Sequence, residues 1–261
     1  MKSLLFIIGL IIILASCNKK KEPKFEYKNS DEVVKYKINI FGGFITDFSK
    51  YVNDDLVEIT TFFISESEIK KTTRNELGEI ISNNTYFMDN SVFAISSIDS
   101  SFGDLGLWLT KSNYKYENDY LVEWGYGYWN YSGGSVDSGY VIIEYAIENG
   151  NTMKQKVMPN GWTSGITDYF TYFNYLNKID VWDFSNGITG KINNNVVGHI
   201  LLKQGIPKHY GSSAYEDFSY EFDENDYVTK MLKIYTPSYN LEEPGVVTRT
   251  VFTTYYEYHF D

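Results

Sequence analysis

The C-terminal run of the chain alternates between two sets of side chains more regularly than any other stretch. One set holds threonine and aromatic residues: Thr248, Thr250, Phe252, Thr254, Tyr256, Tyr258 and Phe260. The other set, from Arg249 to Asp261, mixes charged and apolar residues. Successive side chains of a β-strand point to opposite faces, so this period of two predicts a long terminal strand paired within a sheet.

Shorter runs rich in β-branched and aromatic residues recur along the chain, and we interpret each as a strand. They are Leu56–Ile64, Ile80–Phe87, Val92–Ser96, Tyr120–Trp129, Tyr140–Ile147, Thr152–Met158, Val196–Lys203, Ser213–Phe222 and Val228–Tyr235. Pro207, Pro237 and Pro244 fall in the breaks between them, as expected for a residue that cannot donate to a strand ladder. Ser132–Ser135 (SGGS) predicts a turn.

A local pattern predicts where several strands turn back. An aromatic residue, an Asp four positions later and a Val six positions later start at Tyr27, Tyr51 and Phe222, and Arg74 opens a variant with Gly78 and Ile80. Asn, Asp and Gly adopt the backbone conformations of tight hairpins. We therefore expect hairpins at these places within a meandering antiparallel sheet.

One segment favours a helix. Ile166, Tyr169, Phe170, Phe173 and Leu176 follow helical spacing, which predicts a helix over Ile166–Asn177. Thr163 or Ser164 precedes it as a cap. The polar, Asn-rich stretch from Asp180 to Asn195 predicts an irregular connection.

The composition supports strands over helices, since the 261 residues include 24 Tyr, 17 Phe and 5 Trp, residues that are enriched in β-structure. The single Cys excludes an internal disulfide. We expect an all-β, mostly antiparallel fold: a large curved sheet or open half-barrel with one short helix packed on it, in a single domain over residues 25–261.

The N-terminus predicts export. Lys2, an apolar run from Leu4 to Leu14 and small residues before Cys17 are typical of a signal peptide over residues 1–16. The end of this stretch resembles the lipobox of bacterial lipoproteins, which implies that Cys17 carries lipid and that residues 17–24 form a tether. The apolar run is too short for a membrane-spanning helix. An ordinary signal peptide is the alternative.

The net charge and the residues after Cys17 predict where the protein is located and which partners it binds. A formal net charge of −11 repels phosphate backbones, so we expect no nucleic-acid partner. The partner implied by a lipidated Cys17 is the membrane, through its lipid anchor. Lys19–Lys21 precede Glu22, unlike the acidic export signal of some surface lipoproteins, so we expect outer-membrane anchoring that faces the periplasm.

The segment Tyr220–Met231 (YEFDENDYVTKM) resembles the YD-type strands of Bacteroidetes lipoproteins of unknown function. Gly205-Ile206-Pro207 stands near the position of that family's turn, whereas Asp226 stands where the family has Gly. The resemblance implies a curved antiparallel sheet, porin-like or similar to the LolA/LolB half-barrels, and implies no functional residues.

Catalytic and metal-binding patterns are sparse, and we expect no enzyme activity, no metal and no cofactor. His199, His209 and His259 are isolated, which disfavours a zinc site. Glu123 lies among aromatic residues, but we interpret it as a solvated strand residue. Two acidic stretches, Asp180–Gly187 and Asp223–Asp226, lack EF-hand spacing, and acidic turns are the simpler interpretation.

The aromatic stripe in Tyr120–Trp129 carries the candidate binding residues: Tyr120, Trp124, Tyr126, Tyr128 and Trp129. Rings of this kind line apolar cavities or stack on sugars, or else fill the inside of a curved sheet. We therefore expect a lipid-anchored envelope protein, a binding or scaffold module for a hydrophobic ligand in the concave face. The alternatives are a surface glycan-binding protein that uses Trp124, Trp129 and Trp162, and a carboxylate-dependent glycosidase. A transmembrane barrel would place charged residues such as Arg249, Glu257, Glu144 and Glu148 in lipid, which is costly.

Overall fold

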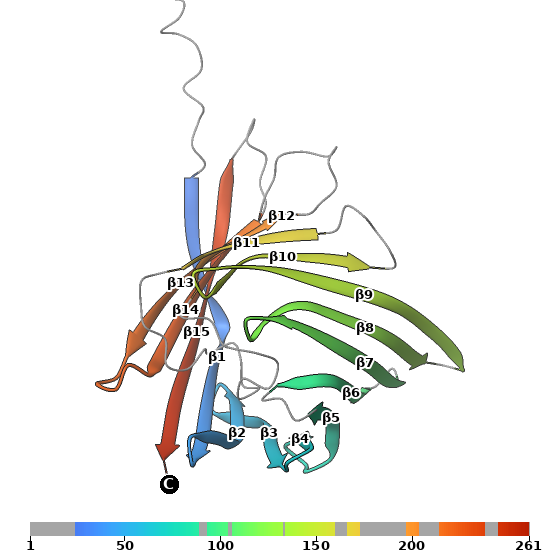
Figure 1. Ribbon diagram of the computed structural model, residues 1–261. Helices are drawn as coiled ribbons and strands as arrows, with labels where there is room; N and C mark the ends of the chain where they lie inside the picture. The colour runs from blue at the N-terminus through green and yellow to red at the C-terminus, as the bar shows by residue number, and fades with distance from the viewer. Residues whose placement is uncertain are drawn as a thin grey trace, which may run out of the picture.

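The computed structural model describes residues 24–88, 93–103, 106–132, 134–159, 166–172, 197–203, 214–237 and 245–260, with backbone only for 166–172 and 197–203. Nearly all of these residues lie in fifteen strands (Figure 1). The strands are β1 (Lys24–Phe41), β2 (Phe44–Val52), β3 (Asp55–Ile64), β4 (Glu68–Asn75), β5 (Ile80–Met88), β6 (Ala94–Gly103), β7 (Gly106–Glu117), β8 (Tyr120–Ser132), β9 (Ser135–Glu148), β10 (Asn151–Pro159), β11 (Ile166–Tyr172), β12 (Val197–Lys203), β13 (Ala214–Phe222), β14 (Val228–Thr236) and β15 (Val246–Phe260).

Each strand pairs with the next one in the chain, always antiparallel, and β15 returns to β1 to close the sheet into a barrel. An odd number of alternating strands brings the first and last strands together in the same direction. The closing pair is accordingly parallel, from Lys24 opposite Val246 to Ile40 opposite Phe260. The expected all-β, antiparallel curved sheet is confirmed, and its curvature continues until the two edges meet.

Tight hairpins connect many neighbours. The two-residue turns Gly42-Gly43, Asn53-Asp54, Asn118-Asp119 and Asn149-Gly150 all have positive φ at both positions. This conformation is the type I′ turn, whose twist matches that of the flanking strands and which Asn, Asp and Gly tolerate best. The hairpins predicted after Tyr51, Arg74 and Phe222 are confirmed.

The prediction at Tyr27 is wrong, because no turn follows it. Tyr27 and Val33 both lie within β1, which continues along β15 through a register shift between Asn29 and Val33. In this place the Asp-containing pattern marks an irregularity in one strand instead of a reversal of the chain.

The helix predicted from Ile166 is also wrong over the part that the structure describes. Ile166–Tyr172 is strand β11, which pairs with β10 on one side and β12 on the other. The apolar spacing was compatible with a helix, but aromatic and β-branched residues prefer strands, and two neighbouring strands here satisfy the backbone groups. Residues 173–177 and the proposed caps Thr163 and Ser164 lie outside the described residues.

Within the described chain, strands approach closely only their hydrogen-bonded neighbours, so no second layer packs against the sheet. The wall is therefore one sheet thick, and it curves round from β1 and β15 past β7–β9 to β2 (Figure 1). No helix of sufficient length and apolarity to cross a membrane occurs among the residues described.

Candidate functional site: the inner face of the barrel

The two faces of the barrel wall differ in burial. Paired residues share a face, so the register can be followed round the ring, and most buried residues fall on one face. These residues are Ile38, Phe48, Thr60, Thr73, Ile69, Tyr86, Ser97, Ser112, Val141, Ile143, Phe218, Met231, Thr254 and Tyr256. Side chains on the concave side of a closed sheet converge and cover one another. We therefore identify this as the inner face.

The outer face carries ion pairs between neighbouring strands. Lys35 contacts Glu257 at 2.9 Å, Lys230 contacts Glu221 at 2.7 Å, and Lys115 contacts Glu123 at 2.5 Å. In each pair one residue occupies each of two adjacent strands, and both side chains retain solvent contact. Such pairs stabilise little, but they show that this face carries charge along the middle of the strands.

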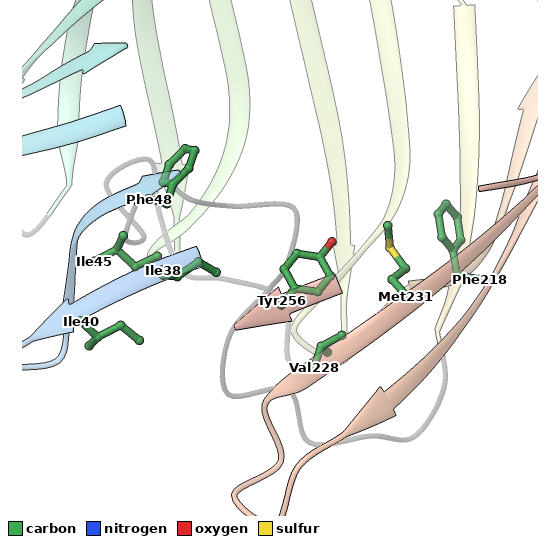
Figure 2. Packing of buried hydrophobic residues seen from close by; sticks show 8 residues of the cluster. All are labelled: Ile38, Ile40, Ile45, Phe48, Phe218, Val228, Met231 and Tyr256. Atoms are coloured by element: carbon green, nitrogen blue, oxygen red, sulfur yellow. The ribbon is translucent and has the colours of Figure 1, made fainter. Parts of the chain in front are cut away.

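An apolar cluster covers one arc of the inner face, on both sides of the parallel seam between β1 and β15. Its buried members are Ile38, Ile40, Ile45, Phe48, Phe218, Val228, Met231 and Tyr256. Figure 2 shows Phe48, Met231 and Phe218 pointing to the same side of the sheet. Tyr36 of β1 stacks on Tyr256 of β15, with ring centroids 5.7 Å apart. The cluster is contiguous across β13, β14, β15, β1 and β2.

Three of the predicted binding residues, Trp124, Tyr126 and Tyr128, lie together on the inner face of β8. The ring centroids of Trp124 and Tyr126 are 4.9 Å apart, and Trp124 also stacks on Tyr114 of β7 at 6.4 Å. Burial raises the pKa of the Tyr126 hydroxyl above its usual range.

The other two predicted residues lie elsewhere. Trp129 pairs with Leu109 and Ser138 on the outer face, where Lys111 lies 5.9 Å from its ring centroid. Tyr120 pairs with Glu117, beyond a register shift between Lys115 and Tyr116. That shift puts one extra residue on β8 and breaks the alternation, so Tyr120 does not continue the row from Trp124 to Tyr128.

Glycines make room for two of the rings. A Cβ on Gly139 of β9 would lie 2.5 Å from the hydroxyl oxygen of Tyr128, so that ring lies across the neighbouring strand. On the outer face, the hydroxyl of Tyr140 covers Gly125 in the same way. Glycine weakens a strand, and here it allows a large ring to lie flat on the wall.

A second feature of the inner face was not predicted from the sequence. Polar atoms on β5, β6 and β8 are buried and lack a hydrogen-bond partner among the described residues: Asn84 Oδ1, Asp99 Oδ1, Trp124 Nε1 and Asn130 Oδ1. Burial raises the pKa of Asp99, and the charge of Lys71 lowers it in part. Asn84 and Asp99 are directly paired, as are Lys71 and Asn84. In the sequence, the only signal for these four residues was the alternation of their strands, because their spacing matches no binding motif.

The candidate catalytic and metal-binding residues are dispersed. Glu123 lies on the outer face against Lys115, and His259 lies there beside Glu257, 3.2 Å from its carboxylate. Asp223 Oδ1 accepts hydrogen bonds from the backbone N–H groups of Asn225 and Tyr227 and so shapes a turn. No group of three or more metal-binding side chains occurs within the described part.

Several predicted residues cannot be placed. Cys17, Trp162, His209, residues 18–23 of the tether and Asp180–Gly187 lie outside the described residues, as does the side chain of His199. Lys24, the last residue of the expected tether, is the first residue of β1.

Comparison with known proteins supports the fold. No protein-family model matches the sequence, and no curated protein matches it. A crystal structure of a porin-like protein from Bacteroides vulgatus is similar, with a TM-score of 0.50 and 13% identity over 74% of this chain and 92% of that chain. A porin-like protein from Bacteroides uniformis has a TM-score of 0.49 and 13% identity over 74% of this chain and 79% of its own. The first likeness shows that the all-β architecture of this chain occurs in a solved structure.

Proposed function

We propose that this protein is a non-enzymatic binding or scaffold module of the bacterial cell envelope that takes up a hydrophobic ligand inside its barrel. In this proposal lipid on Cys17 anchors the chain to the outer membrane, and the barrel faces the periplasm. The N-terminal sequence and the family resemblance support the anchor, and the polarity of the barrel supports the ligand.

The polarity of the wall carries the proposal. The apolar cluster lies on the inner face, where the ion pairs Lys50–Glu58 and Lys233–Glu216 also lie. The outer face carries the pairs Lys35–Glu257, Lys230–Glu221 and Lys115–Glu123 and has no comparable buried apolar cluster among the described residues. A membrane-spanning barrel has the reverse arrangement, with an apolar band outside and a polar interior. In water, charged side chains on the outer face keep a protein soluble, and an apolar inner face can bind a hydrophobic ligand.

The size of the ring leaves room for such a ligand. Side chains just fill a barrel of about 8 strands, whereas 16 to 18 strands leave a channel. With fifteen strands and no described segment inside the wall, the barrel is near the upper end of this range. Small ligand-binding barrels enclose their ligand with inward-facing side chains, and this barrel has an apolar arc on its inner face.

The test combines a probe with two matched variants. Met231 and Leu232 are neighbours on β14 that face opposite sides of the wall, Met231 inside. We expect Met231→Glu to lower the binding of the apolar dye N-phenylnaphthylamine and the amount of co-purified lipid, and Leu232→Glu to leave both unchanged. The Cys17→Ser form of the full chain should lose incorporation of labelled palmitate.

Two results would contradict the proposal. Equal dye binding by the two β14 variants, with both folded by circular dichroism, would show that the dye does not enter the barrel. Unchanged palmitate labelling after Cys17→Ser would show that Cys17 does not carry the lipid. The glycan alternative based on Trp124, Trp129 and Trp162 receives less support, since Trp124 and Trp129 face opposite sides of the wall.

A further inference from the structure

We infer that the outer wall of β6–β9, at the end of the barrel where β1 begins, is a membrane-contact patch that rests on the surface of a lipid bilayer. The inference rests on the part of the proposed function that anchors the chain through Cys17, and it adds how the barrel is oriented on that anchor. The patch consists of Phe102, Leu107, Leu109, Trp129, Tyr131 and Val136.

The strand register places four of these side chains in one row across four strands. Phe102 of β6 pairs with Leu107 of β7. Leu107 also pairs with Tyr131 of β8, which pairs with Val136 of β9. Tyr131 lies two residues beyond Trp129 with no register shift between them, so the row shares the outer face with Trp129. Phe102, Tyr131 and Val136 are 49%, 43% and 58% exposed, so the row is open to a partner.

The residue types in the patch favour a membrane as that partner. Single exposed apolar side chains are common, but contiguous apolar patches mark sites of contact with a protein or a membrane. Trp and Tyr are enriched where a bilayer meets water, because one end of the side chain is apolar and the other is polar. Lys111, 5.9 Å from the Trp129 ring, has a long apolar stem with a charge at its tip, which suits the same boundary.

The patch lies at the end of the barrel that is linked to the lipid anchor. Because neighbouring strands are antiparallel, β7 and β9 begin at the same end as β1, and β6 and β8 finish there. Cys17 is seven residues before Lys24, the first residue of β1. Even a fully extended chain of this length spans at most about 25 Å. A bilayer that holds the acyl chains on Cys17 is therefore next to this mouth of the barrel.

The opposite end of the barrel is unfavourable for membrane contact because its turns are acidic. The described turns there contain no Lys or Arg, whereas carboxylates lie in them or directly flank them: Glu66, Glu117, Asp119, Glu148, Asp223, Glu224 and Asp226. Anionic headgroups repel such an end. The chain that leads from Cys17 to the barrel is instead basic, with Lys19–Lys21 and Lys24. The distribution of charge therefore favours the same orientation as the anchor.

Charged residues further along the same strands limit how deeply the wall enters the bilayer. From Leu107 to Lys111 the rise is about 13 Å along the strand, or about 10 Å along the axis of a barrel with tilted strands. Beyond Lys111, the ion pair between Lys115 and Glu123 lies on the same face. Interfacial apolar surfaces are buried about 5 to 10 Å deep. The patch therefore fits the boundary between headgroups and acyl chains, without spanning the membrane.

Quenching of a fluorescent label by nitroxide-bearing lipids tests this orientation. Cys17 is the only Cys and its thiol is blocked by lipid in the anchored form, so one introduced Cys takes up the dye NBD selectively. The full chain from bacterial membranes carries Tyr131→Cys in the patch, or Phe63→Cys as the control. Phe63 is 62% exposed on the outer face at the acidic end. Each protein is reconstituted in vesicles of phosphatidylcholine and phosphatidylglycerol, with or without nitroxide-labelled phosphatidylcholine.

We expect the nitroxide lipids to lower the fluorescence at position 131 at least about 2-fold and to leave position 63 unchanged. In the Tyr131→Cys background, Val136→Glu places a carboxylate opposite the label and should abolish the quenching. Phe44→Glu at the opposite end of the barrel should leave it unchanged. Val136 and Phe44 are both more than half exposed, so both variants should fold, which circular dichroism checks.

Equal quenching at positions 131 and 63, or none at either, overturns the inference while palmitate incorporation still reports the anchor. A blue-shifted label at position 131 without nitroxide quenching, together with a doubled mass in ultracentrifugation, assigns the patch to a second copy of this chain and also overturns it. Absence of palmitate incorporation overturns the anchor instead, and the same comparison in the Cys17→Ser form then decides on the patch. Because the patch lies outside the barrel, Val136→Glu should leave N-phenylnaphthylamine binding unchanged, so failure of the patch and failure of the interior site give different results.

Discussion

Arg249 holds the first part of β1 against the rest of the barrel, and its removal should open the parallel seam. Pairing with β2 begins only at Val34, so the segment Lys24–Asn29 pairs with β15 alone. Over this segment Arg249 of β15 lies on the ring of Phe25, with Cζ 3.6 Å from the ring centroid. Its Nη1 donates to the Tyr27 hydroxyl at 3.0 Å, and Nη2 approaches the Tyr215 hydroxyl of β13 at 3.5 Å.

The contacts of Arg249 allow an estimate of how much its removal favours opening of the seam. A close cation–π contact at a half-buried site contributes about 1 to 2 kcal/mol. The hydrogen bond from the guanidinium to Tyr27 adds about 1 kcal/mol, and the longer contact to Tyr215 adds little. Arg249→Ala should therefore favour local opening by about 2 kcal/mol, which is about a 30-fold increase in the opening constant. Arg249→Lys keeps the charge but loses the planar stacking, so a smaller increase is expected.

Hydrogen exchange measured by mass spectrometry tests this over Lys24–Asn29 and the facing part of β15. Arg74→Ala is the control, because Arg74 donates only within its own hairpin, to the carbonyl of Gly78 at 2.9 Å. Exchange at the seam that rises equally in Arg249→Ala and Arg74→Ala would refute the reasoning. Exchange that rises across every strand of Arg249→Ala would show a loss of global stability instead of an opened seam.

Two further predictions concern the inner face. Thr60 and Thr73 are buried and their hydroxyls are 2.9 Å apart, so either Thr→Val change alone should lower the free energy of unfolding by about 1 to 2 kcal/mol. The double change should lower it clearly less than the sum of the two single changes. Urea unfolding of all four forms measures these free energies, and additive effects would contradict the prediction. Burial raises the pKa of Asp99 in the folded state, so the ionised carboxylate destabilises the fold at neutral pH. Asp99→Asn should therefore raise the free energy of unfolding at neutral pH. This increase should vanish as the pH falls below the unfolded-state pKa of Asp99, where the carboxyl is protonated in both states. A gain that stays constant with pH in thermal unfolding would show that the charge is not the cause.

Local features of the sequence predicted the strands and most of their turns. The alternation from Thr248 to Phe260 became β15, and Asn53-Asp54 became a type I′ turn. Both depend only on short-range backbone preference and on the side-chain period of a strand. The run Ile166–Tyr172 shows the limit of this approach. Its apolar residues fit either period, and the neighbouring strands β10 and β12 decide between them.

Long-range features could not be predicted in this way. The closure of the barrel depends on pairing between Lys24 and Val246, at opposite ends of the described chain. The position of Tyr120 depends on one extra residue in β8, relative to its partner strand β7. A shift of one residue moves a side chain to the other face. The aromatic row from Trp124 to Tyr128 was therefore predictable, whereas the face on which Tyr120 lies was not.

Several inner-face rings of this aromatic-rich barrel lie against small residues of the adjacent strand. The hydroxyl of Tyr114 on β7 bonds Ser97 of β6 at 2.8 Å, and the hydroxyl of Tyr116 donates to the carbonyl of Ala94 at 2.5 Å. Tyr128 lies over Gly139 of β9. In each pair a ring leans onto a small residue of the adjacent strand, so it covers the wall instead of projecting into the interior. Small residues opposite large ones thus let these rings lie along the described wall.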